Sequence, residues 1–487
     1  MRKPAVMALD LGSQSAKALV FDFHGKLISV SGASYPWLHP EEKMIEIDPE
    51  EVWEAAQSAV EEVVSKTHLE YELKAMSFSY FGHGMLTVDE NYNPTDNIIL
   101  FADTRSLSLK DELTAAGADK VMMEVTRSSA FSPTTAPVKV LWLKRNKPEI
   151  YEKTAYLFDV QQFILARLGL EPVNDGTMAD CKNLFDAEKK QWSERAMDAF
   201  SVPRGWLNGT RVVGADTPVG KITKFGRVDL KSSVVVSPGA HDTECGVLGM
   251  GAIPENPGVL SDSMGTYHQC GFLSEHRDSD VLPSGWAQFI TKCGSFRAHM
   301  VSTSNGGSSL RWFISTFCGG EPIYDELFGA CRFDGKNPSF FVPSFSHENA
   351  GIFKMTLSRT REEIFEALIE GITMTLANGY DGMREKMRLY QGCEIKEIRA
   401  MGGCSRADKF LQLRATVFNI PVVRSSHIQG TGAGAAMLAS VGAGAYKNYK
   451  EASDNMVVLT DRFEPDMKLR PVYMEKLSEF NSIKAGL

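Results

Sequence analysis

The chain has 487 residues, of which 43% are hydrophobic and 23% are charged, and its formal net charge at pH 7 is -9. This length exceeds what one hydrophobic core usually supports, so we expect two large domains. The acidic balance argues against nucleic acid or a membrane as partner, and no apolar run approaches the roughly 20 residues of a spanning helix. The eight cysteines are scattered, which fits reduced thiols, and without a signal-peptide pattern we expect a cytoplasmic protein.

The N-terminal half is predicted to alternate strands with helices. Short apolar runs bounded by glycine and polar residues indicate strands at residues 6–9, 18–23, 27–30, 75–80, 98–101 and 233–236. A helix should begin after Asp48, a favourable N-cap that proline follows, and residues 137–168 look mainly helical. Polar residues directly follow several of the strands, which is where α/β folds bind their ligands.

A second strand-turn-strand pattern, at residues 259–272, resembles the one at the N-terminus. The repetition predicts two related domains with the active site between them. Glycine and proline are dense in residues 245–257, so we place the boundary there and expect domains at residues 1–247 and 248–487. Later helices are predicted at residues 362–380, 408–418 and 432–441.

The first turn, Asp10 to Lys17, has the residues of a phosphate-binding turn. Gly12 permits a tight turn, and N–H groups and side-chain donors for phosphate oxygens follow it, at Ser13, Gln14 and Ser15. Lys17 adds positive charge, and Asp10 can hold Mg²⁺ through water, because this ion keeps several waters and takes few carboxylates. The second turn, Gly265-Thr266, can grip the same triphosphate from the opposite side. An ordinary hairpin turn with solvated polar residues is the alternative.

Asp242 is a candidate general base. A strand is expected before it and a helix of small residues after it, at 244–251, so Asp242 stands at a strand-to-helix junction. A carboxylate there can accept the proton of a substrate hydroxyl during phosphoryl transfer. The alternative is that Asp242 only caps the helix. His241 is a second candidate base, although we favour a structural histidine.

Two more groups of residues follow strand ends. Gly402 and Gly403 let a nucleobase or ribose approach the backbone, unless they form an ordinary strand-to-helix loop. His83, Asp103 and Arg105 are candidates for the substrate side, where one member of the charged pair can bind a polyol hydroxyl. A structural salt bridge between Asp103 and Arg105 is the alternative.

Together, these motifs resemble the FGGY family of carbohydrate kinases over roughly residues 5–445. The segments that carry the resemblance are Asp10-Leu11-Gly12, Glu46–Pro49, Asp103–Arg105, 138–149, 239–251, Ser263–Thr266, Asn305–Trp312, Gly402–Arg406 and 430–446. The resemblance implies an α/β fold of two ribonuclease-H-like domains, as in the actin-like ATPases, with ATP and sugar in the cleft between them.

The resemblance also implies roles for individual residues. It makes Asp242 the catalytic base and a substrate contact, and Asp10 the magnesium-linked carboxylate. It implies sugar contacts at His83 and Asp103. The residues that it implies at ATP are Ser13, Gln14, Lys17, Gly265, Thr266, Gly307, Arg311, Gly402 and Gly403.

Three positions depart from the family pattern. Phe81 stands where the family often has glutamine, Phe101 where it has tryptophan, and Cys404 replaces the third glycine of the nucleoside turn. The first two lie on the substrate side, so they bear on which sugar is bound rather than on the chemistry.

We therefore expect a kinase that uses ATP and Mg²⁺ to phosphorylate a hydroxyl of a ketose, such as the pentuloses xylulose or ribulose, or of a related polyol. One alternative is an actin-like or Hsp70-like ATPase module, and another is a catalytically silent sensor of sugar or nucleotide. The sequence leaves the oligomeric state open, with a homodimer among the alternatives.

Overall fold

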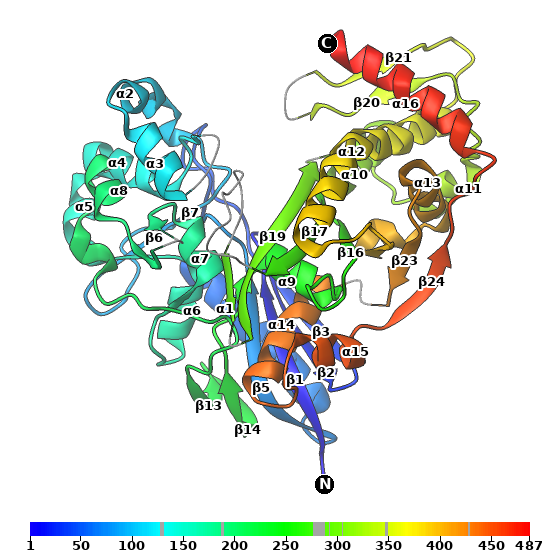
Figure 1. The fold of residues 1–487 in the computed structure, drawn as a ribbon. Helices are drawn as coiled ribbons and strands as arrows, with labels where there is room; N and C mark the ends of the chain where they lie inside the picture. The colour runs from blue at the N-terminus through cyan, green and yellow to red at the C-terminus, as the bar shows by residue number, and fades with distance from the viewer. Residues whose placement is uncertain are drawn as a thin grey trace. The chain divides into compact units, whose positions relative to one another are not determined.

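The computed structural model describes residues 1–126, 131–186, 189–275, 288–291, 293–303, 305–345, 349–426 and 429–487 (Figure 1). The chain divides into two compact units. Unit 1 contains Met1–Gly249, Glu275–Ala298 and Thr431–Met456, and unit 2 contains Met250–Ser274, His299–Gly430 and Val457–Leu487. Each unit is thus assembled from separated stretches of chain, and the predicted division of function at residue 247 remains a prediction.

Unit 1 is built on a mixed sheet with the strand order β13-β14-β5-β1-β2-β3. Its strands are β1 (Lys3–Leu11), β2 (Ser15–Asp22), β3 (Leu27–Ser34), β5 (Tyr71–Tyr80), β13 (Gly220–Phe225) and β14 (Val228–Val236). The first three pair antiparallel in sequence, whereas β5 runs parallel to β1 and β14 runs parallel to β5. A short strand, β15 (Ala240–His241), also pairs with β5 in parallel. The strands predicted at 6–9, 18–23, 27–30, 75–80 and 233–236 are confirmed.

Helix α1 (Pro49–Thr67) covers one face of this sheet by packing against β2 and β3. It begins as predicted after Asp48, whose carboxylate accepts a hydrogen bond of 2.8 Å from the Glu50 N–H. Its buried face includes Val52, Ala56 and Val60, which are 0% exposed. Spacings of three to four residues put these side chains on one side of the helix, so burial of that side holds α1 on the sheet.

A helical region of unit 1 has its own hydrophobic core. The core includes Leu113, Met122, Leu143 and Met197. They come from the helices α2 (Lys110–Ala115), α3 (Ala118–Thr126), α4 (Ala136–Asn146) and α8 (Glu194–Ala199). The stretch predicted to be mainly helical contains α4, α5 (Pro148–Lys153) and α6 (Val160–Arg167), with the short strand β8 (Tyr156–Phe158) before α6. The strand predicted at 98–101 is only β7 (Ile98–Ile99), paired with β4 (Glu46–Ile47).

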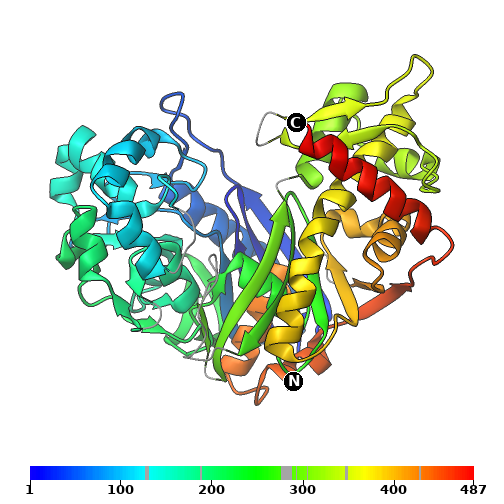
Figure 2. The ribbon, with the colours of Figure 1, turned by 45° about the horizontal axis from the view of Figure 1, so that its top comes forward.

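A second sheet, most of which lies in unit 2, has strands in the order β19-β17-β16-β22-β23-β24. They are β16 (Val259–Met264), β17 (His268–Glu275), β19 (Gly294–Thr303), β22 (Glu397–Met401), β23 (Val422–Ser425) and β24 (Leu459–Phe463). The helices α12 (Arg361–Gln391), α13 (Asp408–Phe418) and α16 (Arg470–Ala485) contact one another. Figure 2 shows α12 in yellow and α16 in red within this unit.

The two units repeat one strand pattern, as predicted. In unit 1, β1 pairs antiparallel with β2 on one side and parallel with β5 on the other. In unit 2, β16 pairs antiparallel with β17 and parallel with β22 in the same way. The α/β fold with two related domains is therefore confirmed. In the ranges that the structure describes, no helix is long and apolar enough to cross a membrane.

Candidate active site

The turn between β1 and β2 holds the predicted phosphate-binding residues. The Gly12 N–H bonds the Ser15 carbonyl at 3.0 Å and closes the turn. The side chains of Tyr35 and Trp37 donate to the Gly12 and Ser13 carbonyls, and the Tyr35 N–H donates to the Gln14 carbonyl. The carbonyl oxygens are thus occupied, whereas the N–H groups of Ser13 and Gln14 have no acceptor among the described residues and remain available to phosphate oxygens.

Asp10 lies near the end of β1, opposite Lys17 on β2. One oxygen of its carboxylate accepts a hydrogen bond of 2.7 Å from the Ser79 hydroxyl. The other oxygen has no protein donor in the part of the chain that the structure describes. Asp10 therefore keeps one carboxylate oxygen for an ion or for a water molecule.

Asp242 begins helix α9 (Asp242–Gly249) directly after β15, so the predicted strand-to-helix junction is confirmed. Gly239 permits the close approach of this segment to β5, because its φ is 82° and a Cβ there would lie 2.1 Å from the Phe78 carbonyl oxygen. The Asp242 side chain keeps 38% of its surface exposed. Desolvation by the surrounding protein raises the pKa of Asp242, the charges of Asp10 and Glu244 raise it further, and His241 opposes them.

His241 lies between two carboxylates. Its Nδ1 is 2.7 Å from Glu244 Oε2, and its Nε2 is 3.2 Å from Asp242 Oδ1. Burial by itself lowers the pKa of His241, but the charges of Glu244 and Asp242 outweigh that effect and raise it to about 9. An imidazolium with both nitrogens engaged cannot accept a proton from a substrate, which favours the structural role over the role of base.

His83 lies in the loop after β5 with a left-handed backbone, φ 58°. Its Nδ1 is 3.1 Å from the Cys181 carbonyl oxygen. Desolvation and the neighbouring His241 lower the pKa of His83 to about 4, so the ring is neutral at physiological pH. Because a carbonyl oxygen only accepts, Nδ1–H donates to Cys181, and the neutral ring leaves Nε2 as an acceptor for a sugar hydroxyl.

His83 also lines a cavity of about 260 Å³ in unit 1. The other lining residues are Phe101, Met122, Thr126, Ser132, Thr134, Thr135 and Asn183. Hydroxyl and amide groups thus face two apolar side chains. Phe101, one of the departures from the family pattern, borders the cavity, whereas Phe81 is 2% exposed and packs in the core of the sheet. Only the first of these two departures touches this candidate sugar pocket.

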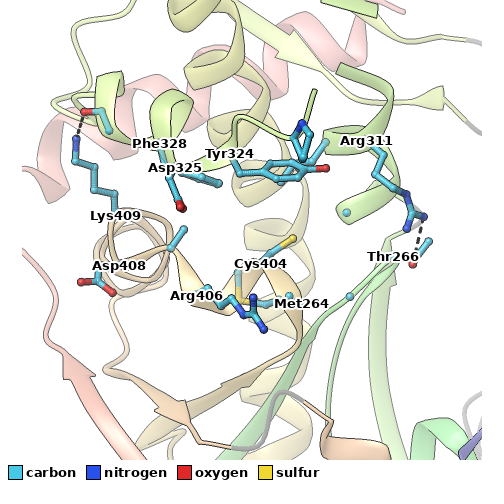
Figure 3. Close-up of a pocket in the computed structure, with 17 residues that line it drawn as sticks. Met264, Thr266, Arg311, Tyr324, Asp325, Phe328, Cys404, Arg406, Asp408 and Lys409 are labelled. Carbon is cyan, nitrogen blue, oxygen red and sulfur yellow. Dashed lines mark hydrogen bonds between the residues drawn. The ribbon is translucent and has the colours of Figure 1, made fainter. Parts of the chain in front are cut away.

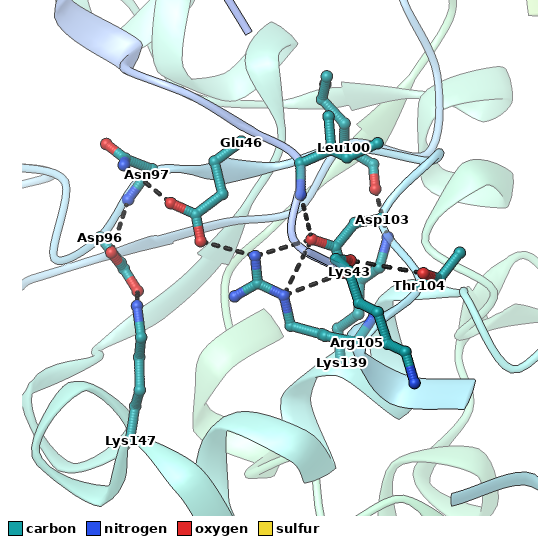
Figure 4. A network of polar contacts seen from close by, with 11 residues as sticks. Lys43, Glu46, Asp96, Asn97, Leu100, Asp103, Thr104, Arg105, Lys139 and Lys147 are labelled. Atoms are coloured by element: carbon teal, nitrogen blue, oxygen red, sulfur yellow. Dashed lines mark hydrogen bonds and ion pairs between the residues drawn. The ribbon is translucent and has the colours of Figure 1, made fainter. Parts of the chain in front are cut away.

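Asp103 and Arg105 form a salt bridge, which is the structural alternative to the predicted sugar contact. Figure 4 shows the Arg105 guanidinium between Asp103 and Glu46. Its Nη2 is 2.7 Å from Asp103 Oδ2 and 2.6 Å from Glu46 Oε1. The two Asp103 oxygens also accept from the Ile45 and Arg105 N–H groups, and the residue is 0% exposed. Asp103 thus has no exposed oxygen for a sugar hydroxyl, and this geometry favours the structural alternative over the predicted sugar contact.

Unit 2 contains a cavity of about 770 Å³ that gathers most of the ATP residues predicted there (Figure 3). Gly265 and Thr266 come from the turn between β16 and β17, and Gly307 and Arg311 from helix α10 (Gly307–Phe317). Gly403, on the short helix η4 (Gly403–Arg406), borders the cavity as well. Five residues that are far apart in the sequence thus line one pocket.

The backbone around this cavity is closely packed. The Gly307 N–H donates to the Gly265 carbonyl at 2.8 Å, and the Ser308 N–H donates to the Thr266 carbonyl at 3.1 Å. Gly402 does not line the cavity but lies behind the same turn. Its φ is 93°, and a Cβ there would lie 2.8 Å from the Met264 carbonyl carbon. Only glycine fits that position without strain.

The sequence patterns missed several residues of the larger cavity. Tyr324 and Phe328 on α11 (Tyr324–Ala330) line it, as do Arg406 and Lys409, and Figure 3 shows Tyr324 and Cys404 pointing into the same space. Tyr324 and Phe328 are four residues apart, which is a readable sign of one helix face. Nothing in that spacing shows which cavity the face lines.

A two-unit α/β fold with glycine-rich turns after the first strand of each sheet and a carboxylate at a helix start fits the class of phosphoryl-transfer enzymes. The N-terminal domain of the FGGY family of carbohydrate kinases matches residues 5–249, and the C-terminal domain of that family matches residues 322–443. The chain belongs to this family. It is an ATP-dependent carbohydrate kinase, which transfers a phosphoryl group to an alcohol group.

Relatives support the assignment over the whole length. The xylulose kinase of Lactococcus lactis is 27% identical over 473 residues, covering 92% of each chain. The L-xylulose/3-keto-L-gulonate kinase of Escherichia coli is 25% identical and covers 99% of this chain and 97% of its own.

Solved structures have the same fold. The xylulose kinase of Lactobacillus acidophilus superposes with a TM-score of 0.84 at 19% identity, covering 99% and 98% of the two chains. The glycerol kinase of Plasmodium falciparum with ADP gives 0.83 at 20% identity, with the same coverage.

Proposed function

We propose that this kinase phosphorylates a hydroxyl of a ketose, most closely a pentulose such as xylulose or ribulose, or of a related polyol, with Asp242 as general base. The observation that carries the proposal is the setting of Asp242. Its carboxylate is partly exposed at the start of α9, has a raised pKa and lies in the same unit as Asp10. Relatives that are named xylulose kinase support the sugar class.

The chemical step needs little from the protein beyond placement and charge. Asp242 accepts the proton of the substrate hydroxyl as its oxygen bonds to the γ-phosphorus of ATP. The bond from that phosphorus to the β–γ bridging oxygen breaks, and ADP leaves with the electron pair. A base with a raised pKa accepts this proton more readily than an ordinary aspartate, provided that it stays ionised at the working pH.

ATP takes the larger cavity in this proposal. Thr266 and Arg311 offer a hydroxyl and a guanidinium to phosphate oxygens, and the Tyr324 ring offers a face for the base. In unit 1, the N–H groups of Ser13 and Gln14 and the Lys17 ammonium are further donors to phosphate.

Mg²⁺ fits the residues present as the partner of ATP. The described residues contain no group of three or more His, Cys, Asp or Glu that could hold a metal ion. Mg²⁺ usually binds through one or two carboxylates together with substrate phosphates and waters, and Asp10 has one carboxylate oxygen free for this purpose. When bound, the ion neutralises charge on the transferred phosphoryl group.

The test is sugar-dependent release of ADP from Mg·ATP, with a panel of ketopentoses, ketohexoses, deoxyketoses, polyols and gluconate. The proposal expects one ketose or polyol to raise ADP release far above the rate without sugar. Gluconate as the best substrate would contradict the sugar class. A high rate that no sugar changes would instead favour the ATPase module, and binding of sugar and ATP without turnover would favour the sensor.

A further inference from the structure

We propose that His241 is a positioning residue, which holds one oxygen of the Asp242 carboxylate and leaves the other oxygen to accept the substrate proton. This inference rests on the proposed role of Asp242 as base. In this proposal the side chains of Glu244, His241 and Asp242 form a hydrogen-bonded series, in which only Asp242 contacts the substrate.

The imidazole is fixed at both ring nitrogens. Nδ1 is 2.7 Å from Glu244 Oε2, and Nε2 is 3.2 Å from Asp242 Oδ1. Glu244 has only 3% of its side chain exposed and sits three residues after His241, so it reaches back along the first turn of α9. A buried glutamate of this kind is an effective anchor, because leaving it without a partner is costly.

The surroundings also restrict the ring and the backbone of His241. The His241 N–H donates to the Thr177 hydroxyl at 2.9 Å, which ties the residue to helix α7 (Gly176–Cys181). The backbone of Gly82 lies close to the imidazole ring, since a Cβ at that position would be 2.5 Å from His241 Nε2. A ring with so little space cannot turn away from Asp242, so its contact with the base is kept.

The charges around Glu244, His241 and Asp242 explain why a cation is needed there. The titratable groups that face His241 and Asp242 are Glu244 of α9 itself and Asp10, His83, Asp175 and Asp180 of neighbouring elements. All are carboxylates except His83, which is neutral because its own pKa is lowered to about 4. His241 is the nearby positive charge that opposes the raised pKa of Asp242, and so keeps the base ionised.

Substitutions of His241 and of Glu244 should change the pH profile of kcat in two different ways. In His241→Gln the cation is lost, so the pKa of Asp242 rises further and the acid limb of kcat moves up by about one pH unit. In Glu244→Gln the imidazolium loses the neighbouring charge that raises its pKa most, so the pKa of His241 falls below about 9. Above that pKa the neutral ring has a single N–H and no longer donates to both of its neighbours, so the alkaline limb of kcat moves to lower pH.

The experiment measures kcat and KM from pH 5 to 10 with Mg·ATP and the best sugar of the panel. His241→Gln should lower kcat about 10- to 100-fold with the KM for ATP within about twofold. His24→Gln is the matched control, because His24 is exposed in the turn between β2 and β3. It should leave both limbs in place. Melting temperatures show that each variant is folded.

Each result decides the proposal. A His241→Gln variant with wild-type kcat and an unmoved acid limb would overturn it, as would a variant in which only the KM for the sugar changes. If His241→Gln does not fold, Glu244→Gln decides the test by itself. An alkaline limb of kcat that does not move in Glu244→Gln would then overturn the proposal. Full activity in Asp242→Asn would remove the proposed base itself, whereas an inactive Asp242→Asn beside an unchanged His241→Gln would remove only the role of His241.

Discussion

Asp242 and Asp103 differ in how far solvent reaches their carboxylates. The Asp242 side chain is 38% exposed, whereas Asp103 is 0% exposed and bound to Arg105. Both aspartates follow a strand and neither is distinguished by its sequence neighbours alone. The residue that can meet a substrate is therefore identified by its packing, not by its type.

Asp103→Asn should act on stability rather than on sugar binding. The substitution leaves the buried Arg105 guanidinium with Glu46 as its remaining carboxylate partner and weakens the hydrogen bonds to Asp103, at a cost of about 1–3 kcal/mol. Urea denaturation of the variant should show this loss, with the KM for the sugar within about twofold. Glu112→Gln is the control, because its pair with Arg145 is exposed to solvent and should contribute little to stability. A large rise in the KM for the sugar without loss of stability would restore the predicted contact.

His241 should stabilise the fold in a pH-dependent way. Its pKa is raised from 6.5 to about 9, so its contribution is complete below pH 6.5 and is lost as the pH rises through about 9. The melting temperature of His241→Gln should therefore lie furthest below wild type at pH 6 and approach it at pH 9.5. A difference that is constant over this range would contradict the assigned charge.

At the scale of elements, the turn between β16 and β17 is held from several sides. Gly307 and Ser308 of α10 donate to its carbonyls. Next to it, Arg414 of α13 is fully buried and pairs with Asp262 of β16. Since Gly265 and Thr266 belong to this turn, its rigidity sets where their groups point into the larger cavity.

Gly402→Ala should disturb that turn. The substitution adds a Cβ at a φ of 93° and against the Met264 backbone, so we expect a loss of about 1–3 kcal/mol and a higher KM for ATP. Gly403→Ala is the matched control for stability, because a Cβ there meets nothing within 4 Å. Equal melting temperatures for the two variants would show that the close approach at Gly402 carries no strain.

The elements show which features the sequence could predict. Helix α13 begins and ends where predicted, because Asp408–Phe418 is a periodic segment between a turn and Asn419 in the left-handed conformation. The strand predicted at 98–101 is shorter, since the chain turns at Leu100, whose carbonyl accepts from the Asp103 N–H. Tyr324 was missed because no helix was predicted at residues 324–330, and a helical pattern gives an apolar face but not the partner of that face.

At the scale of the whole molecule, the compact units are not continuous in the chain. Helix α14 (Gly430–Gly442) lies almost entirely in unit 1, although the strands before it belong to unit 2. A Cβ at Gly434 would lie 1.9 Å from the Cys245 carbonyl oxygen, so α14 packs directly on α9. The sequence marks α14 as rich in small residues, but only tertiary contacts show which helix it meets.

The proposed division of ligands between the units is testable by binding. Tyr324→Ala removes a ring from the larger cavity and should weaken ATP binding about tenfold, with sugar affinity unchanged within about twofold. His83→Ala should do the reverse, because His83 borders the smaller cavity. Isothermal titration calorimetry with ATP and with the sugar measures both. If both variants weakened the same ligand, this assignment would be wrong.

The most direct test of the account compares wild type with Asp242→Asn in one phosphorus NMR experiment with Mg·ATP and the sugar identified in the panel. The wild type should convert the γ-phosphoryl signal of ATP into a sugar phosphate ester. Asp242→Asn should form the ester about 10²- to 10⁴-fold more slowly, because the amide cannot accept the proton, while the melting temperature and the ATP affinity stay near wild type. Ester formation by Asp242→Asn at the wild-type rate would contradict the assignment of Asp242 as the base.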